Sequence, residues 1–132
     1  MTFADDSTTM TTKDSPHPFD ETVSRLVELI TARAMKVFLV VDQAAEARAA
    51  GLQLRPTTLV VFGNPVAGTA VMAAAPLAAL DLPLKVLIWA DGDDTKVTYL
   101  SPHALAARYE LDADLAHSLA GIDALTDALV TP

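Results

Sequence analysis

The stretch LVVFGNPVAGTAV, residues 59–71, passes from an apolar run through a glycine corner into a second apolar segment. The run before Gly63 predicts a buried strand, because it is continuous and rich in β-branched residues. Asn64 is a favoured helix N-cap and Pro65 a favoured first helical residue, so a helix is expected over residues 65–75. The stretch therefore indicates a strand, a sharp corner and a helix.

Further strands and helices of the same kind are predicted on both sides of this corner. A spacing of i, i+3 and i+4 in the apolar residues predicts a helix over residues 19–35, with Asp20 as its N-cap. Asp42 is the expected cap of the next helix, and the Asp-Gly pair at residues 91–92 indicates a hairpin. The other predicted elements are strands at 8–13, 37–41, 58–62, 84–90 and 96–100, and helices at 43–50, 102–109 and from 112 onward.

The predicted order is β-α-β-α-β-α-β-β-α-α, which indicates an α+β fold with a small mixed sheet covered by helices. The length of 132 residues suits one domain. We expect residues 1–14 to be a tail that includes the short first strand, and residues 15–132 to form the single domain.

Composition excludes several classes of function. A net charge of -8 disfavours a nucleic-acid partner and an anionic membrane surface. The N-terminal residues contain no apolar signal segment, and no apolar run is long enough to span a bilayer, so a cytoplasmic protein is expected. The chain has no cysteine, which rules out thiolate catalysis and Cys-based metal sites.

The corner at residues 63–69 has part of the pattern of a phosphate-binding loop. Gly63 and Gly68 have the required spacing, but Thr69 and Ala70 stand where the loop needs Lys and Ser or Thr. A structural strand-to-helix corner is therefore favoured over a nucleotide site. A helix N-terminus also attracts anions without these side chains, so a weak anion site stays open.

Other polar residues give no catalytic or metal pattern. His17, His103 and His117 lack metal-ligand spacing, so no metal is predicted unless all three converge from distant segments. A calcium loop takes its ligands from positions distributed over twelve residues, which the acidic run at residues 91–94 does not offer. This run is therefore predicted to be a solvated turn. No serine lies in a nucleophile elbow, so no catalytic residue is predicted.

The chain contains the segments ARAAGLQLRPT, VVFGNPVAGTAVM and ALDLPLKVLIW in this order. Together they resemble the DUF302 family of small bacterial and archaeal proteins, and the resemblance extends from about residue 15 to residue 111. It implies a compact α+β domain that commonly pairs as a homodimer, and it implies no established reaction. The chain departs from the family pattern at four positions where polar residues are common, namely Gln43, Ala73, Ala90 and Leu100.

The leading hypothesis is a non-enzymatic homodimer that needs no cofactor and acts through its surface or a modest pocket. The alternative is a domain, or an enzyme, for a small anionic ligand held by the helix start at Asn64 and Pro65 and by Arg48 or Arg55. A third hypothesis, a metal- or haem-binding accessory, requires the three histidines to cluster. The tentative ligand-binding residues are Asp42, Arg48, Arg55, Gly63, Asn64 and Asp81.

Overall fold

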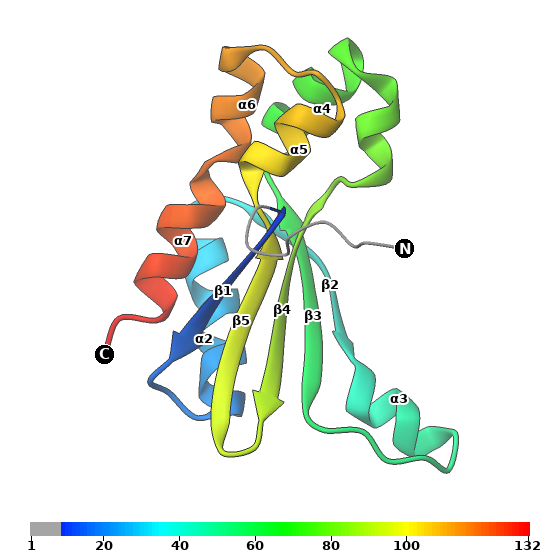
Figure 1. The fold of residues 1–132 in the computed structure, drawn as a ribbon, viewed down its shortest axis with the longest axis vertical. Helices are drawn as coiled ribbons and strands as arrows, with labels where there is room; N and C mark the ends of the chain where they lie inside the picture. Colours follow the sequence, from blue (N-terminus) through cyan, green and yellow to red (C-terminus); the bar gives the residue numbers. More distant parts are fainter. Residues whose placement is uncertain (1–8) are drawn as a thin grey trace.

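A computed structural model describes residues 9–132 as a five-stranded sheet with helices on one face and beyond both ends (Figure 1). The sheet has the strand order β1-β5-β4-β3-β2. The α+β class and the predicted order of elements are confirmed. The strands are β1 (Met10–Ser15), β2 (Lys36–Asp42), β3 (Thr57–Gly63), β4 (Leu84–Asp91) and β5 (Asp94–Leu100). The helices are α2 (Phe19–Ala32), α3 (Gln43–Ala49), α4 (Pro65–Ala74), the 3-10 helix η1 (Pro76–Leu80), α5 (Pro102–Arg108), α6 (Ala113–Leu119) and α7 (Gly121–Leu129).

All neighbouring strands are antiparallel, where the sequence predicted a mixed sheet. The reason lies in the helical connections. α3 extends beyond one end of the sheet, and α4 with η1 extends beyond the other (Figure 1). Each of these helices therefore belongs to a long hairpin connection between adjacent strands, rather than to a crossover that would make them parallel.

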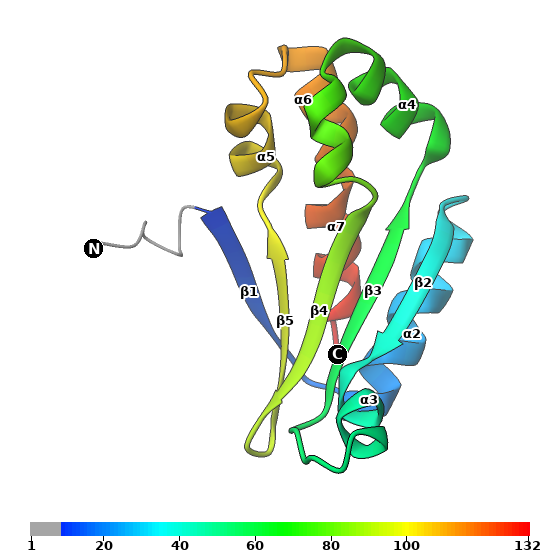
Figure 2. The same ribbon diagram turned by 90° about the vertical axis from the view of Figure 1, so that its right-hand side faces the viewer.

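Helices cover only one face of the sheet. Figure 2 shows α2 and α7 behind the strands and no helix in front of the middle of the sheet. The covered face forms the main core, which we call the sheet cluster. Its buried members are Leu26, Ile30, Val60, Phe62, Val86, Ile88, Val97, Tyr99, Ile122, Leu125 and Leu129.

A second, smaller core lies beyond the end of the sheet where β3 ends. It consists of Val71, Ala78, Leu105 and Leu119, one residue each from α4, η1, α5 and α6, and we call it the cap cluster. These four helical elements stand together at the top of Figure 1. The molecule therefore has two hydrophobic centres, one under the sheet and one among the helices at its end.

The helix starts show which local predictions hold. Asp42, Ser101 and Asp112 each accept a backbone N–H of the first helical turn, at 2.9, 3.1 and 2.9 Å. The predicted cap at Asp20 is wrong, because α2 begins at Phe19 and Pro18, two residues before Asp20, occupies the N-cap position. The Pro18 carbonyl accepts the first helical N–H there, so this helix starts without a side-chain cap.

The two ends of the chain differ in detail from the prediction. The first strand covers Met10–Ser15 and pairs with β5, whereas the tail expected before it lies outside the described residues. The expected final helix divides at Ala120 into α6 and α7. The division lets α6 pack in the cap cluster while α7 packs on the sheet cluster.

The β4–β5 hairpin forms as the Asp-Gly pair predicts. Asp91 lies opposite Asp94, which leaves a two-residue turn. Gly92 has φ of 61°, a left-handed conformation that favours glycine.

Candidate functional site

A cavity of about 350 Å³ lies where the two clusters meet. Its walls are the corner between β3 and α4, the corner before β4, the start of β2 and the break between α6 and α7. Both sequence motifs that mark the corners line it, Gly63-Asn64-Pro65 and the Leu82-Pro83 part of the second. The corners also touch, since a Cβ added to Gly63 would lie 3.7 Å from the Cβ of Pro83. The main apolar side chains are Met35, Phe38, Phe62, Met72, Leu82 and Ile122.

The cavity presents few polar groups, and none of the described residues that line it is charged. Thr69 Oγ1 and Ser118 Oγ each donate to a carbonyl of their own helix, both at 2.6 Å. Both hydroxyl protons are therefore used within the helices, so these two side chains can only accept a hydrogen bond from a ligand. Asn64 Oδ1 accepts backbone N–H groups, so the amide NH₂ of Asn64 is the group left to donate.

The first turn of α4 uses its own N–H groups within the helix start. Asn64 Oδ1 accepts from Val66 at 2.9 Å and from Ala67 at 3.4 Å, and the Asn64 carbonyl accepts from Gly68 at 2.8 Å. Pro65 has no N–H. Three of the positions that are normally unsatisfied at a helix start, Pro65, Val66 and Ala67, therefore have no free N–H to offer, which weakens the case for the anion site that the sequence left open.

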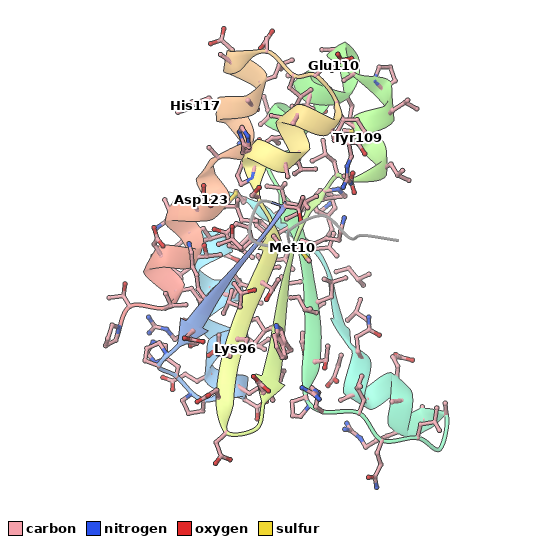
Figure 3. All side chains as sticks on the ribbon, viewed as in Figure 1. Met10, Lys96, Tyr109, Glu110, His117 and Asp123 are labelled. Carbon is pink, nitrogen blue, oxygen red and sulfur yellow. The ribbon has the colours of Figure 1, made fainter. Side chains whose placement is uncertain are left out.

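Asp81 lies beside the cavity, and its carboxylate is used in hydrogen bonds within the protein. Its carboxylate accepts a hydrogen bond from the Tyr109 hydroxyl and another from Arg108 Nη1 at 2.7 Å. The hydrogen bond from Tyr109, with the charge and hydrogen bond of Arg108, lowers the pKa of Asp81 below its usual value of 3.8. Figure 3 shows Tyr109 at the helical end of the molecule. Asp81 therefore ties the end of η1 to α5.

The other three predicted ligand residues lie at the opposite end of the sheet. Asp42 caps α3, and Arg48 is exposed in the last turn of that helix. Arg55 Nη1 lies 3.9 Å from Asp91 Oδ1, beside the β4–β5 hairpin. β3 has seven residues between this end and Asn64, a span of about 20 Å. Arg48 and Arg55 therefore cannot serve an anion bound beside Asn64.

The histidines do not converge. The His17 ring lies 2.9 Å from the carbonyl of Thr131 at the C-terminal end of the chain. His103 is on α5, and His117 is on α6 at the top of Figure 3. Within residues 9–132, no group of three or more His, Asp or Glu residues could hold a metal ion.

The four positions that depart from the family pattern are also divided between the ends of the sheet. Gln43 begins α3 and Ala90 lies next to the hairpin, whereas Ala73 is exposed on α4 and Leu100 ends β5 near the cap cluster. None of the four lines the cavity.

A polar cluster on the covered side fixes α7, which forms one cavity wall. Lys13 Nζ of β1 lies 2.7 Å from Thr126 Oγ1 and 2.7 Å from Asp127 Oδ1. The Tyr99 hydroxyl of β5 donates to Asp123 Oδ1 at 2.5 Å, and Figure 3 labels Asp123 on this helix. Burial lowers the pKa of Lys13, but the hydrogen bonds and charges of Asp127 and Tyr99 offset this, so the pKa is raised above 10.5.

Sequence reasoning identified Gly63 and Asn64 and missed most of the cavity. Met35, Phe38 and Met72 are apolar residues in predicted elements, where they are indistinguishable from core residues. Ser118 and Ile122 reach the cavity because the final helix breaks at Ala120. The sequence signal that could have indicated the cavity was the pair of corner motifs, Gly63-Asn64-Pro65 and Leu82-Pro83, since residues of both line it.

The fold defines an antiparallel α+β domain with one helix-free sheet face and an apolar cavity at its helical end. The chain belongs to the DUF302 family. Residues 11–129 match the family described as "Domain of unknown function DUF302".

A solved structure shares the fold. The crystal structure of the uncharacterized conserved protein DUF302 from Bacillus stearothermophilus matches with a TM-score of 0.77, covering 92% of this chain and 94% of that chain. The two sequences are 22% identical over this match.

Three curated relatives are longer proteins. The chain is 40% identical over 103 residues to "Fluoride-specific ion channel FluC 1" of Brucella suis and of Brucella abortus, and to "Fluoride-specific ion channel FluC 2" of Brucella melitensis. The match covers 77% of this chain and 41%, 38% and 38% of those proteins, so the chain spans about two fifths of their length. In residues 9–132 of this chain, we find no helix with the length and apolar character needed to cross a membrane.

Proposed function

We propose that this DUF302 protein is a non-enzymatic homodimer that binds a small, mainly apolar molecule in the cavity beside Asn64. The observation that carries the proposal is that both corner motifs of the family line one uncharged cavity of about 350 Å³. This volume lies in the range of about 300–1,000 Å³ that is typical of small-molecule sites.

The lining defines the chemistry of the ligand. Phe38 and Phe62 supply flat apolar surface, and Met35 and Met72 supply flexible side chains that adapt to irregular shapes. The Asn64 amide can donate to one carbonyl or hydroxyl oxygen at the rim. The expected ligand is thus an apolar body that carries one hydrogen-bond acceptor.

Exposed apolar surface supports the homodimer. One face of the sheet has no helix over it, and it carries half-buried Leu59, Val61, Leu87 and Trp89. Leu39 is 56% exposed on the edge strand beside them. Contiguous apolar surface of this kind is typical of protein interfaces.

The ligand proposal can be tested by filling the cavity from Gly68. A Cβ at this position would point toward Met72 and lie 3.9 Å from its Cε, so the space there is open. Leucine also has a higher helix propensity than glycine, so Gly68→Leu should block the cavity without destabilising α4. Ala73→Leu is the matched control, since Ala73 is exposed on the same helix and outside the cavity.

The measurement is thermal unfolding with indole, 1-decanol, naphthalene, inorganic phosphate and sodium fluoride as separate probes. A probe at one hundred times its dissociation constant stabilises a protein by about 2.7 kcal/mol. We expect at least one apolar probe to stabilise the wild type and Ala73→Leu but not Gly68→Leu. Phosphate and fluoride should have no effect.

Three results would contradict the proposal. No stabilisation by any apolar probe would exclude the ligand class. Equal stabilisation of Gly68→Leu would place binding elsewhere on the protein. A monomer by light scattering at micromolar concentration would exclude the homodimer.

A further inference from the structure

A second cavity of about 210 Å³ lies where β4 and β5 separate. β4 pairs with β5 only as far as Leu87 and Thr98. Beyond these residues β4 extends to Leu84 and β5 to Leu100 without pairing with each other. Figure 2 shows the two strands diverging toward the helical end of the molecule. Leu84 and Ile122 line both cavities, so they form the wall between them.

The second cavity has an apolar lining on the helix-free face of the sheet. Val86 and Ile88 of β4 are buried in the sheet cluster, so Leu87 between them points to the other face. Leu87 lies directly opposite Leu59 of β3 and Thr98 of β5, and all three line the cavity. Other apolar side chains of the lining are Met10, Leu100 and Leu105. Because a cavity of about 150 Å³ accommodates benzene, this one has room for an aromatic ring or a short alkyl chain.

The lining also holds a cation that forms no ion pair within residues 9–132. This cation is Lys85, which lies on the same face of β4 as Leu87. Asp81 lines the cavity too, but its carboxylate already accepts hydrogen bonds from Tyr109 and Arg108. These hydrogen bonds, together with the charges of Arg108 and Lys85, lower the pKa of Asp81. Two cations therefore accompany one carboxylate, and the lysine can bind a second.

We propose that the second cavity binds a small carboxylic acid in its ionised form. The apolar part of this ligand lies against Leu59 and Leu87, and its carboxylate accepts hydrogen bonds from Lys85 Nζ. Hydrogen bonds between such charged groups are stronger than those between neutral groups. The ligand differs in charge from the one proposed for the cavity beside Asn64, and the inference does not rest on that proposal.

Equilibrium dialysis with radiolabelled phenylacetate at neutral pH tests this site. Lys85→Met keeps the apolar stem and should raise the dissociation constant roughly three- to tenfold, whereas Lys85→Arg keeps the charge and should stay close to wild type. Lys96→Met is the matched control, because Lys96 is on the same face but outside the cavity, and it should bind like wild type. Leu59 and Leu87 also belong to the face proposed for the homodimer, so all variants are compared at one protein concentration.

Two competitors test the charge of the ligand. Phenethyl alcohol and phenethylamine carry the same ring with a neutral and a cationic end. The alcohol should displace phenylacetate roughly three- to tenfold less effectively than unlabelled phenylacetate does, and the amine should be weaker still.

Trp89 provides a second readout close to the cavity. It is the only tryptophan of the chain, and its Nε1 donates a hydrogen bond to Thr98 Oγ1 at 3.0 Å. Since Thr98 lines the cavity, phenylacetate should change the fluorescence of the wild-type protein over the same concentrations at which dialysis detects binding.

Several outcomes would overturn the inference. One is the absence of saturable phenylacetate binding, and another is a Lys85→Met variant that binds as tightly as wild type or no more weakly than Lys96→Met. Loss of phenylacetate binding in Gly68→Leu would also overturn it, because the ligand would then occupy the cavity beside Asn64. The thermal-unfolding test with apolar probes is independent of these measurements, so either proposal can fail alone.

Discussion

Arg108 Nη1 donates a hydrogen bond to Asp81 Oδ2 over 2.7 Å, and this contact joins the end of η1 to α5. Asp81 immediately precedes Leu82 and Pro83, which line the cavity. The position of one cavity wall therefore depends on a polar contact outside it. The Asp81 side chain is only 20% exposed, so the contact is partly shielded from water.

Asp81→Asn should lower the free energy of unfolding by about 1–2 kcal/mol at neutral pH, since it removes charged hydrogen bonds. The folded pKa of Asp81 is lowered, so this stabilisation is present above the usual value of 3.8 and is lost as the pH falls through the folded pKa. Urea unfolding at about pH 7 and about pH 3 checks this. The difference from wild type should shrink in acid, and an equal difference at both values would contradict it.

Asn64→Ala should destabilise the protein by about 1 kcal/mol, because the α4 cap is lost. Asn64→Asp keeps a capping oxygen and should stay close to wild type in thermal unfolding. It also removes the amide donor and places a negative charge at the cavity, so its affinity for an apolar probe should fall. An Asn64→Asp variant as unstable as Asn64→Ala would contradict the role of the cap.

Lys13→Met keeps an apolar stem while removing the contacts to Thr126 and Asp127. We expect a loss of about 1–2 kcal/mol in urea unfolding at neutral pH. The folded pKa of Lys13 is raised, so this contribution is fully present below 10.5 and is lost only as the pH rises through the folded value. Lys85→Met, at an exposed position, is the control and should change stability little.

Two glycines should respond to alanine in opposite directions. Gly121 begins α7 and a Cβ there meets nothing within 4 Å, so Gly121→Ala should stabilise by about 0.5–1 kcal/mol. Gly92 has φ of 61°, so Gly92→Ala should destabilise by about 1–2 kcal/mol. Paired thermal unfolding curves measure both, and the same sign for both variants would contradict this account.

The sequence predicted the features that neighbouring residues determine. Caps such as Asn64 and Asp112, and the Asp-Gly hairpin, follow from short-range chemistry, and all three occur in the structure. The strand direction was missed because it depends on where α3 and α4 extend, which no local pattern encodes. The division at Ala120 was missed because one continuous apolar stripe serves two separate cores.

The cavity could be predicted only in part. Asn64, which the sequence predicted as a ligand-binding residue, lines the cavity. Arg48 and Arg55, which the sequence grouped with it, lie at the other end of β3. Met35 and Phe38 were not identified, since an apolar residue that lines a cavity has the same sequence signature as one that fills a core.

The two hydrophobic clusters have a consequence for exchange of a bound molecule. The cap cluster has four buried members, and the sheet cluster has many more, so the helices at the end of the sheet should open at a lower free energy than the sheet. The cavity lies at their junction. A small molecule bound in the cavity would leave when these helices open locally. The rate of that opening would set its residence time, while the strands of the sheet remain folded.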